Sequence, residues 1–233
     1  GGAEEASVTG HGGVVYDEGR TYESKDELSF KEGIVFDSFT PRNAMPGDVI
    51  TVKGDYLYSV QQVVLSNDVY VTGEQIIEKS RRELKFIVPS EAVTGPVTIG
   101  DVNEKDNPDG LVPNNIPSAE NLEIGSPTVK SVDRGMLKAG ATIKVEGTFL
   151  DMIQSVSVGG KTVDFVLAED NKSLTVVLPD SVQEGEVILV SYAGEEINAG
   201  AYTTVIPTNV AIKAESRYKA GLNAIVTGKD LDL

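Results

Sequence analysis

Apolar and polar residues alternate along much of this chain, so that every second residue is apolar over short segments. The clearest alternating sets are Ile50 and Val52; Leu84, Phe86 and Val88; Ile143 and Val145; and Leu174, Val176 and Leu178. Side chains of a β-strand point in turn to opposite faces, so this period predicts strands that bury one face. No segment combines a helical period with capping residues. The pattern therefore predicts an all-β chain.

One sequence frame occurs three times, in residues 46–57, 139–150 and 220–231. In each copy a second glycine follows the first by seven positions, and a leucine follows the second glycine by three. We expect the first glycine to turn the chain with a positive φ, and the leucine to fill the end of a core. The first glycines are Gly47, Gly140 and Gly221, and the leucines are Leu57, Leu150 and Leu231. The repeat predicts a string of similar modules, an arrangement suited to binding or spacing.

Following the repeat outward predicts about seven short strands in each complete module, which is typical of an antiparallel β-sandwich. Pro127 and Pro207 precede the second and third modules. Two strands cannot close a core, so we expect the natural chain to continue beyond Leu233. We predict four parts: an acidic leader or tether at 1–33, sandwiches at 34–126 and 127–207, and the opening strands of an incomplete third sandwich at 208–233.

Two details of the repeat give specific expectations. Tyr56 and Phe149 occupy the same position, one residue before the leucine, and we expect both rings in the core. Lys213 falls where the first two modules carry the apolar Phe39 and Val132. This mismatch leaves the register of the third module's first strand open.

The first module is longer than the second in one place. Pro89 and Pro127 are 38 residues apart, whereas Pro179 and Pro207 are 28 apart, so we predict a long loop near 101–117. Its candidate calcium ligands, which offer the hard oxygens that Ca²⁺ prefers, are Asp101, Asn103, Asp106 and Asp109. Their spacing does not match an EF-hand, and the Asn-Pro-Asp-Gly in this loop forms a turn without any metal. Calcium binding and a metal-free turn are the two hypotheses, and no other cofactor is predicted.

The chain of 233 residues carries 20 basic and 36 acidic side chains, a formal net charge of −16. A field of this sign repels phosphate backbones and anionic membrane surfaces, so we predict no nucleic-acid partner. No apolar run is long enough to span a membrane. Membrane attachment is expected only through an N-terminal lipid anchor outside this sequence.

Residues for catalysis are scarce. The chain has no cysteine and one histidine, His11, which excludes most pairs of nucleophile and base. Acids are abundant, but no pair of carboxylates stands out by position. No glycine cluster precedes a helix in the manner of a phosphate-binding loop. We predict that the chain is not an enzyme.

The residues Ser38-Phe39-Thr40-Pro41, followed by 46–57, resemble the opening of an IPT/TIG domain, a module with an immunoglobulin-like fold. The resemblance covers about residues 34–233 and is most specific in the first module. It implies tandem immunoglobulin-like sandwiches. Tandem IPT/TIG repeats are similar to the spacer region of outer-membrane surface glycan-binding lipoproteins of gut Bacteroidetes. The resemblance therefore implies a protein on the extracellular face of the bacterial outer membrane, or a secreted one, with a polysaccharide or a cell-surface protein as its partner.

Glycan binding needs aromatic platforms, and this chain has no tryptophan. The possible surface rings are Tyr58, Tyr70, Tyr192, Tyr202 and Tyr218, and the first four of these are the candidate glycan contacts. Tyrosine is also a favoured strand residue whose hydroxyl reaches water, so a purely structural role is the alternative for each.

We interpret the chain as non-catalytic extracellular spacer or binding modules of a bacterial cell-surface protein in a glycan-binding and uptake system. One alternative is a protein-binding or adhesion array that uses sheet edges or the long loop as contacts. The other is a set of accessory modules of a secreted polysaccharide-degrading enzyme. Fold does not decide among the three, because unrelated functions share sandwich folds.

Overall fold

The computed structural model describes residues 13–15, 21–23, 32–132, 136–137, 140–178, 184–204, 208–213 and 225–229. In this part of the chain the regular structure is almost entirely β-strand, and the prediction of an all-β chain is confirmed. Its helices are single 3₁₀ turns: η1 (Leu57–Ser59), η2 (Gly73–Gln75) and η3 (Leu150–Met152). Over these described residues, no helix reaches the length and apolarity needed to cross a membrane.

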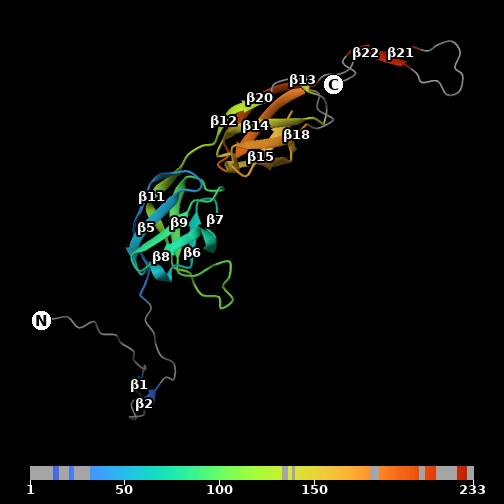
Figure 1. Cartoon of the computed structure of the whole chain (residues 1–233). Helices are drawn as coiled ribbons and strands as arrows, with labels where there is room; N and C mark the ends of the chain where they lie inside the picture. Colours follow the sequence, from blue (N-terminus) through green and yellow to red (C-terminus); the bar gives the residue numbers. More distant parts are fainter. Residues whose placement is uncertain are drawn as a thin grey trace.

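Residues 34–124 form a first sandwich of two packed sheets (Figure 1). One sheet has the order β3 (Val35–Thr40), β5 (Val49–Asp55), β9 (Glu83–Ile87), β8 (Ile76–Lys79). The other has the order β4 (Asn43–Ala44), β11 (Asn115–Ile124), β10 (Gly95–Gly100), β6 (Gln62–Leu65), β7 (Val69–Tyr70). Short strands joined by turns thus close one core from two faces.

Residues 128–204 form a second sandwich with the same strand order. Its first sheet runs β12 (Thr128–Val132), β14 (Thr142–Thr148), β18 (Ser173–Val177), β17 (Phe165–Leu167). Its second runs β13 (Met136–Leu137), β20 (Glu196–Thr204), β19 (Glu184–Ser191), β15 (Ile153–Val158), β16 (Lys161–Val163). Even the parallel pairing recurs, β4 with β11 in the first sandwich and β13 with β20 in the second. The sequence repeat is therefore a repeat of topology.

Each sandwich has its own core, built from the alternating positions. In the first, the fully buried side chains include Ile50, Val52, Leu84 and Phe86. In the second, the equivalent Ile143, Val145, Leu174 and Val176 are buried to the same degree. Burial of this apolar surface is the main stabilising contribution to each module. The repeated leucines Leu57 and Leu150 are also fully buried, as predicted.

Glycine is required at the two repeated positions for two different physical reasons. Gly47 and Gly140 turn the chain with φ of 90° and 76°, as expected for the first glycine. The second glycine is required by close packing, because a Cβ on Gly54 would lie 1.8 Å from the carbonyl oxygen of Val35. A Cβ on Gly147 would lie 1.9 Å from the same atom of Thr128. Both carbonyls belong to the neighbouring strand next to a register shift, which brings the two backbones together.

The expectation that Tyr56 and Phe149 lie in the core is wrong. Both adopt the left-handed conformation, with φ of 54° and 53°, at the start of η1 and η3. This conformation places the following leucine in the core and leaves Phe149 37% exposed and Tyr56 half-buried. The aromatic residue therefore covers the end of the sandwich from outside.

The hairpin of the third module resolves its register. Strands β21 (Thr208–Lys213) and β22 (Ile225–Lys229) are antiparallel, and Val226 lies opposite Ile212. In the first two modules the equivalent valines lie opposite Phe39 and Val132. Ile212, one position before Lys213, thus stands at the register position of Phe39 and Val132, and the sequence between this position and the first glycine of the frame is one residue longer here.

The predicted leader and third module are only partly described. Within 1–33, β1 (Gly13–Val15) pairs with β2 (Thr21–Glu23) in an antiparallel ladder, and residue 32 begins the continuous described chain. His11, the remainder of the leader and the remainder of 208–233 lie outside the described residues. The division of the chain at 126, 127 and 207 stays a prediction.

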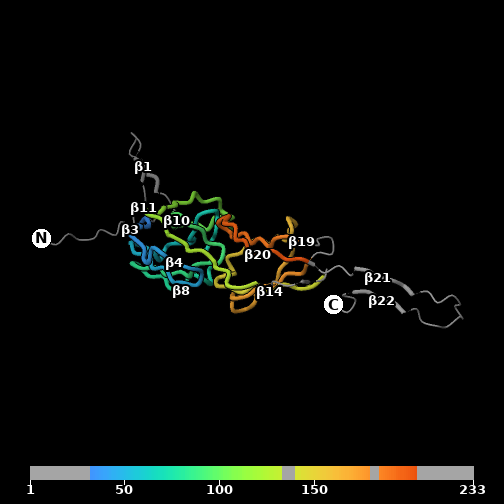
Figure 2. Tube along the Cα trace, turned by 90° about the horizontal axis from the view of Figure 1, so that it is seen from above, coloured from blue at the N-terminus to red at the C-terminus, as the bar shows by residue number. Residues whose placement is uncertain are grey.

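The two sandwiches follow one another along the long axis of the molecule, as both views show (Figures 1 and 2). Strand β11 ends at Ile124 and β12 begins at Thr128, so only residues 125–127 connect the modules. The ends of the first sandwich are therefore distinct. One faces the second sandwich, and the other carries η1 and the long loop between β10 and β11.

Candidate functional site

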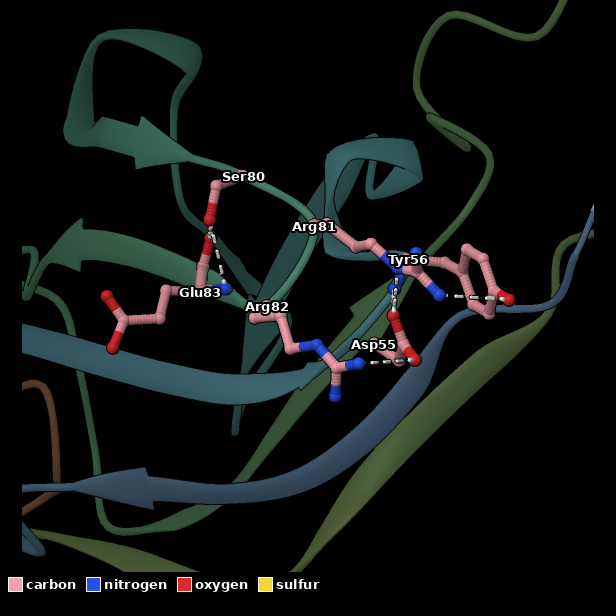
Figure 3. Close-up of polar contacts among 6 residues, drawn as sticks. All are labelled: Asp55, Tyr56, Ser80, Arg81, Arg82 and Glu83. Carbon is pink, nitrogen blue, oxygen red and sulfur yellow. Dashed lines mark hydrogen bonds and ion pairs between the residues drawn. The ribbon is translucent and has the colours of Figure 1, made fainter.

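An arginine–tyrosine cluster, drawn in Figure 3, lies beside η1, at the end of the first sandwich that does not face the second. The turn between β8 and β9 is closed by Ser80, whose hydroxyl donates to the carbonyl of Glu83 at 3.1 Å. This turn holds Arg81 against the strand end, where its Nε donates to Asp55 Oδ1 at 2.8 Å. Arg82, from the same turn, lies 3.8 Å from Asp55 Oδ2. Two cations thus share one carboxylate.

The aromatic part of this cluster lies beside the ion pair. The guanidinium of Arg81 lies over the ring of Tyr56, 4.7 Å from its centre. Tyr58, a predicted ligand contact, packs edge to face on Tyr56 at 6.3 Å and is 52% exposed. Tyr58 is therefore a surface ring, as expected of a platform, although it does not line any of the cavities found in the described residues.

Pairing of Asp55 with Arg81 shifts the pKa of both groups. The hydrogen bond from Arg81 lowers the pKa of the Asp55 carboxyl, and burial opposes part of that change. The backbone N–H of Tyr56 also donates to this carboxylate, at 2.9 Å, and favours the same ionised form. Asp55 is therefore an ionised anchor of the cluster rather than a proton donor.

The long connection between β10 and β11 spans residues 101–114 and begins beside η1, since Gln61 N donates to Gly100 O at 2.8 Å. The loop is held by its own side chains. Asp101 Oδ1 accepts from the backbone N–H of Asn114 at 2.8 Å, and Asn103 Oδ1 accepts from that of Lys105 at 3.1 Å. Asn107 both donates to and accepts from the backbone of Leu111.

These contacts bear on the candidate calcium ligands. Asp101 and Asn103 each use a side-chain oxygen inside the loop, while Asp106 and Asp109 are exposed. Within the described residues, no three histidine, cysteine or acidic side chains are gathered closely enough to hold a metal. The structure thus gives the loop an ordered turn network, and calcium binding by Asp101, Asn103, Asp106 and Asp109 stays a hypothesis.

The loop also covers the edge strand that carries Tyr70. The Lys105 ammonium lies 4.1 Å from the centre of the Tyr70 ring, a cation–π contact. Nearby, Gln62 donates to Glu104 Oε2 at 2.6 Å and ties the loop to β6. Tyr70 is therefore half-buried, and Lys105 covers a face of its ring. This favours a structural role for the ring over a role as a free binding platform.

The opposite end of the first sandwich meets the second sandwich. Ser90, in the turn after β9, donates its hydroxyl to Asp151 Oδ2 of η3 at 2.5 Å. The other carboxylate oxygen of Asp151 is buried and has no hydrogen-bond partner among the described residues. Pro127 and Met152 are buried at this junction, and Met152 belongs to neither core. The modules are thus joined by contacts as well as by the chain.

A cavity of about 530 Å³ lies at this junction. Its walls come from both sandwiches: residues 67, 92–94 and 124 of the first, the link 125–127, and residues 152, 154 and 191–195 of the second. Tyr192, a predicted ligand contact, is one of these lining residues and is half-buried. Burial raises the pKa of its phenol, and the negative charge of Glu91 raises it further. The phenol therefore stays protonated and able to donate a hydrogen bond.

The predicted surface position of Tyr202 is wrong. Its side chain is 3% exposed and packs in the core of the second sandwich, and burial raises the pKa of its phenol. A register shift beside Gly200 breaks the alternation of β20, so Tyr202 shares the buried face of Ala199, three residues before it. The candidate tyrosines thus separate: Tyr58 and Tyr70 at one end of the first sandwich, Tyr192 at the junction, and Tyr202 inside.

Sequence reasoning missed the junction residues Ser90 and Asp151. The signal lies in the repeat, where Asp151 occupies the position of Tyr58 in the first module. An aspartate replacing an aromatic residue at a module end marks a polar contact there. Arg81 was also missed, because its partner Asp55 is distant in sequence.

No family model and no curated protein matches the chain. Solved structures do resemble it, at low identity. The protein SGBP-B from a xyloglucan utilization locus of Bacteroides uniformis is 19% identical over 72% of this chain and 49% of its own, with a TM-score of 0.31. The surface glycan-binding protein PbSGBP-B of Prevotella bryantii is 19% identical over 76% and 38%, with a TM-score of 0.36. The extracellular region of plexin A4 reaches the same TM-score, 0.36, at 14% identity over 82% and 20%.

The chain spans about half the length, or less, of these solved structures. They include bacterial glycan-binding proteins and plexin A4 alike, at similar scores. Likenesses of this strength carry no argument about function.

Proposed function

We propose that the chain is a non-catalytic arm of tandem immunoglobulin-like sandwiches on a bacterial cell surface, and that the arm serves a glycan-capture system. The junction between the two sandwiches is the observation that best supports an arm. A link of residues 125–127, a buried Pro127 and the bond between Ser90 and Asp151 couple two sandwiches in line. Coupled modules hold whatever lies at their two ends at a set separation.

The glycan part of this proposal is supported by the resemblance of the repeat to the spacer modules of surface glycan-binding lipoproteins. The resemblance also supplies the location, on the outer face of the outer membrane. The chain carries a net charge of −16, which suits neutral polymers better than phosphorylated or sulfated ones.

Deletion of the gene from cells that express the protein tests this function. Intact cells are first labelled with antibody raised against the chain, and then tested for capture of fluorescent neutral polysaccharides. The panel includes xyloglucan and mixed-linkage glucan, the glycans named for the proteins of Bacteroides uniformis and Bacteroides ovatus. We expect surface labelling, and weaker capture of at least one glycan after deletion. Unlabelled intact cells, or capture that deletion leaves unchanged throughout the panel, would overturn the proposal.

The purified chain tests the non-catalytic part. Incubation with the same polysaccharides is expected to release no new reducing ends, measured against a glucanase as the positive control. Release of reducing ends by the chain, and its loss in a variant of one carboxylate, would place an enzyme here.

A protein-binding role is the second candidate, and the loop 101–114 favours it. Its tip exposes two apolar side chains, Leu111 at 57% and Val112 at 90%. A photo-crosslinking amino acid at Val112 is expected to capture a specific cell-surface protein on expressing cells if this role is right. The same label at the exposed Glu74 is the control, and equal capture at both positions argues against the loop as a contact.

A further inference from the structure

The junction cavity has the size and the walls of a ligand site. Its volume of about 530 Å³ lies within the range of small-ligand pockets, and it occurs where such pockets concentrate, between two domains. Its exposed lining side chains include those of Asn67, Thr94, Gln154 and Glu195. The cavity is therefore open to solvent and accessible to a segment of a polymer.

Three of its polar side chains are not used by the described fold. Asn67 and Gln154 offer amides and Glu195 offers a carboxylate, and none of these side chains makes a hydrogen bond or ion pair within the described chain. By contrast, the neighbouring Thr94 hydroxyl is engaged and accepts from Ile124 N at 2.9 Å. Amide and carboxylate groups that converge on a cavity without internal partners are available to a ligand.

The other walls are apolar or aromatic. Met152 and Ala92 are buried beneath the cavity, and the half-buried ring of Tyr192 forms part of its wall. An aromatic ring and a thioether pack well against the C–H face of a ligand. The donors and acceptors around them match a molecule that is polar at its edges and apolar on its faces.

Charge decides the class of such a ligand. Glu195 lines the cavity, and the charge of Glu91 acts on Tyr192 from its margin. No lysine or arginine is among the lining residues. A phosphate, sulfate or uronate would meet repulsion here. Vicinal hydroxyl groups, which donate to a carboxylate and accept from amides and phenols, meet none.

We infer that the junction cavity binds a neutral saccharide segment, with Tyr192 as the aromatic wall and Asn67, Gln154 and Glu195 as partners for its hydroxyl groups. The inference rests on the proposed function only in taking the ligand to be part of a glycan. It adds that the arm itself contacts the polymer, and does so where its two modules meet.

Calorimetric titration of the whole 233-residue chain with xyloglucan and mixed-linkage glucan oligosaccharides tests the site. We expect binding of at least one oligosaccharide, weakened at least tenfold by Tyr192→Ala and by Gln154→Ala. Gln61→Ala is the matched control for Gln154→Ala, because it removes an exposed side-chain amide at the far end of the first sandwich. Circular dichroism melting confirms that each variant is folded.

Tyr192→Phe separates the ring from its hydroxyl and is expected to weaken binding less than Tyr192→Ala. Binding that survives both Tyr192→Ala and Gln154→Ala in folded proteins overturns the inference. Failure of both oligosaccharides to bind the wild-type chain overturns it as well. Neither result bears on the proposed function of the chain as an arm. That function is tested separately, by the loss of glycan capture on gene deletion.

Discussion

The hydroxyl of Ser90 donates to the carboxylate of Asp151 across the boundary between the two sandwiches, at 2.5 Å. A hydrogen bond to a charged group contributes more than a neutral one, about 1.5–3 kcal/mol. Removing Ser90 would also leave a second oxygen of the Asp151 carboxylate without a partner at a partly buried site. This contact is therefore the structural basis for a fixed arrangement of the modules.

Ser90→Ala is expected to loosen the junction without unfolding either sandwich, because each has its own core. Limited proteolysis, followed by mass spectrometry, measures this as faster cleavage within residues 125–127. Ser38→Ala, on an exposed strand position, is the control. Equal cleavage rates in both variants would show that the hydrogen bond between Ser90 and Asp151 does not hold the junction.

The second repeated glycines are expected to tolerate no side chain. Gly54→Ala and Gly147→Ala each force a Cβ onto a backbone carbonyl, 1.8 Å and 1.9 Å away, which a strand cannot relieve without shifting. We expect each to lower the free energy of unfolding of its module by more than about 3 kcal/mol. Urea unfolding measures the change.

Gly73→Ala is the matched control for these substitutions, because no atom lies within 4 Å of the position that a Cβ on Gly73 would take. Its effect on the free energy of unfolding is expected to stay within about 0.5 kcal/mol. A loss at Gly73 comparable to that at Gly54 or Gly147 contradicts the close-approach explanation.

Acid unfolding tests the cluster at the end of the first sandwich. The pKa of Asp55 is lowered in the folded state, chiefly by Arg81, so the ionised carboxylate stabilises the fold above its unfolded pKa of about 3.9. That stabilisation is lost as the pH falls through the lower, folded pKa. Arg81→Ala is therefore expected to lower the melting temperature near neutral pH, by a margin that shrinks in strong acid.

Melting curves from about pH 7 to about pH 2 measure this margin. Arg82→Ala is the control, since Arg82 lies 3.8 Å from Asp55 and contributes least to its shift. The part of the Arg81 effect that comes from contact with Tyr56 is independent of pH. A margin that does not change with pH would assign the whole effect to that contact.

Calcium is expected to leave the melting temperature unchanged, because the loop 101–114 is already held by Asp101, Asn103 and Asn107. A ligand at a hundredfold excess over its Kd would stabilise the fold by about 2.7 kcal/mol. Calorimetric scans with calcium and with EDTA measure the difference. If calcium raises the melting temperature and Asp106→Ala abolishes that rise, the loop is a metal site instead.

The period of two and the glycine frame were enough to predict the strands, the repeat and the cores. They work because alternation and positive φ are local properties that a sequence displays directly. Tyr56 and Tyr202 show the limit. A left-handed residue before Leu57 and a bend at Gly200 before Tyr202 redirect side chains, and neither backbone state follows from hydrophobic pattern.

The candidate site was less predictable, because its parts meet only after folding. Tyr192 was selected as a surface ring, but its neighbours Asn67 and Gln154 come from different modules and carry no local motif. The same holds for Arg81 and Asp55, which lie in contact although they are far apart in the sequence. Contacts of this kind are set by the stacking of modules rather than by any one segment.

The distance between the two sandwiches distinguishes a coupled arm from loosely linked modules. The chain has no cysteine, so Glu74→Cys and Glu169→Cys, both at exposed positions, place one spin label in each sandwich. Double electron–electron resonance then measures the distribution of their separations. We expect a single narrow distribution that broadens in Asp151→Ala. A broad distribution in the otherwise unchanged chain would show that the two sandwiches are not held at a fixed separation.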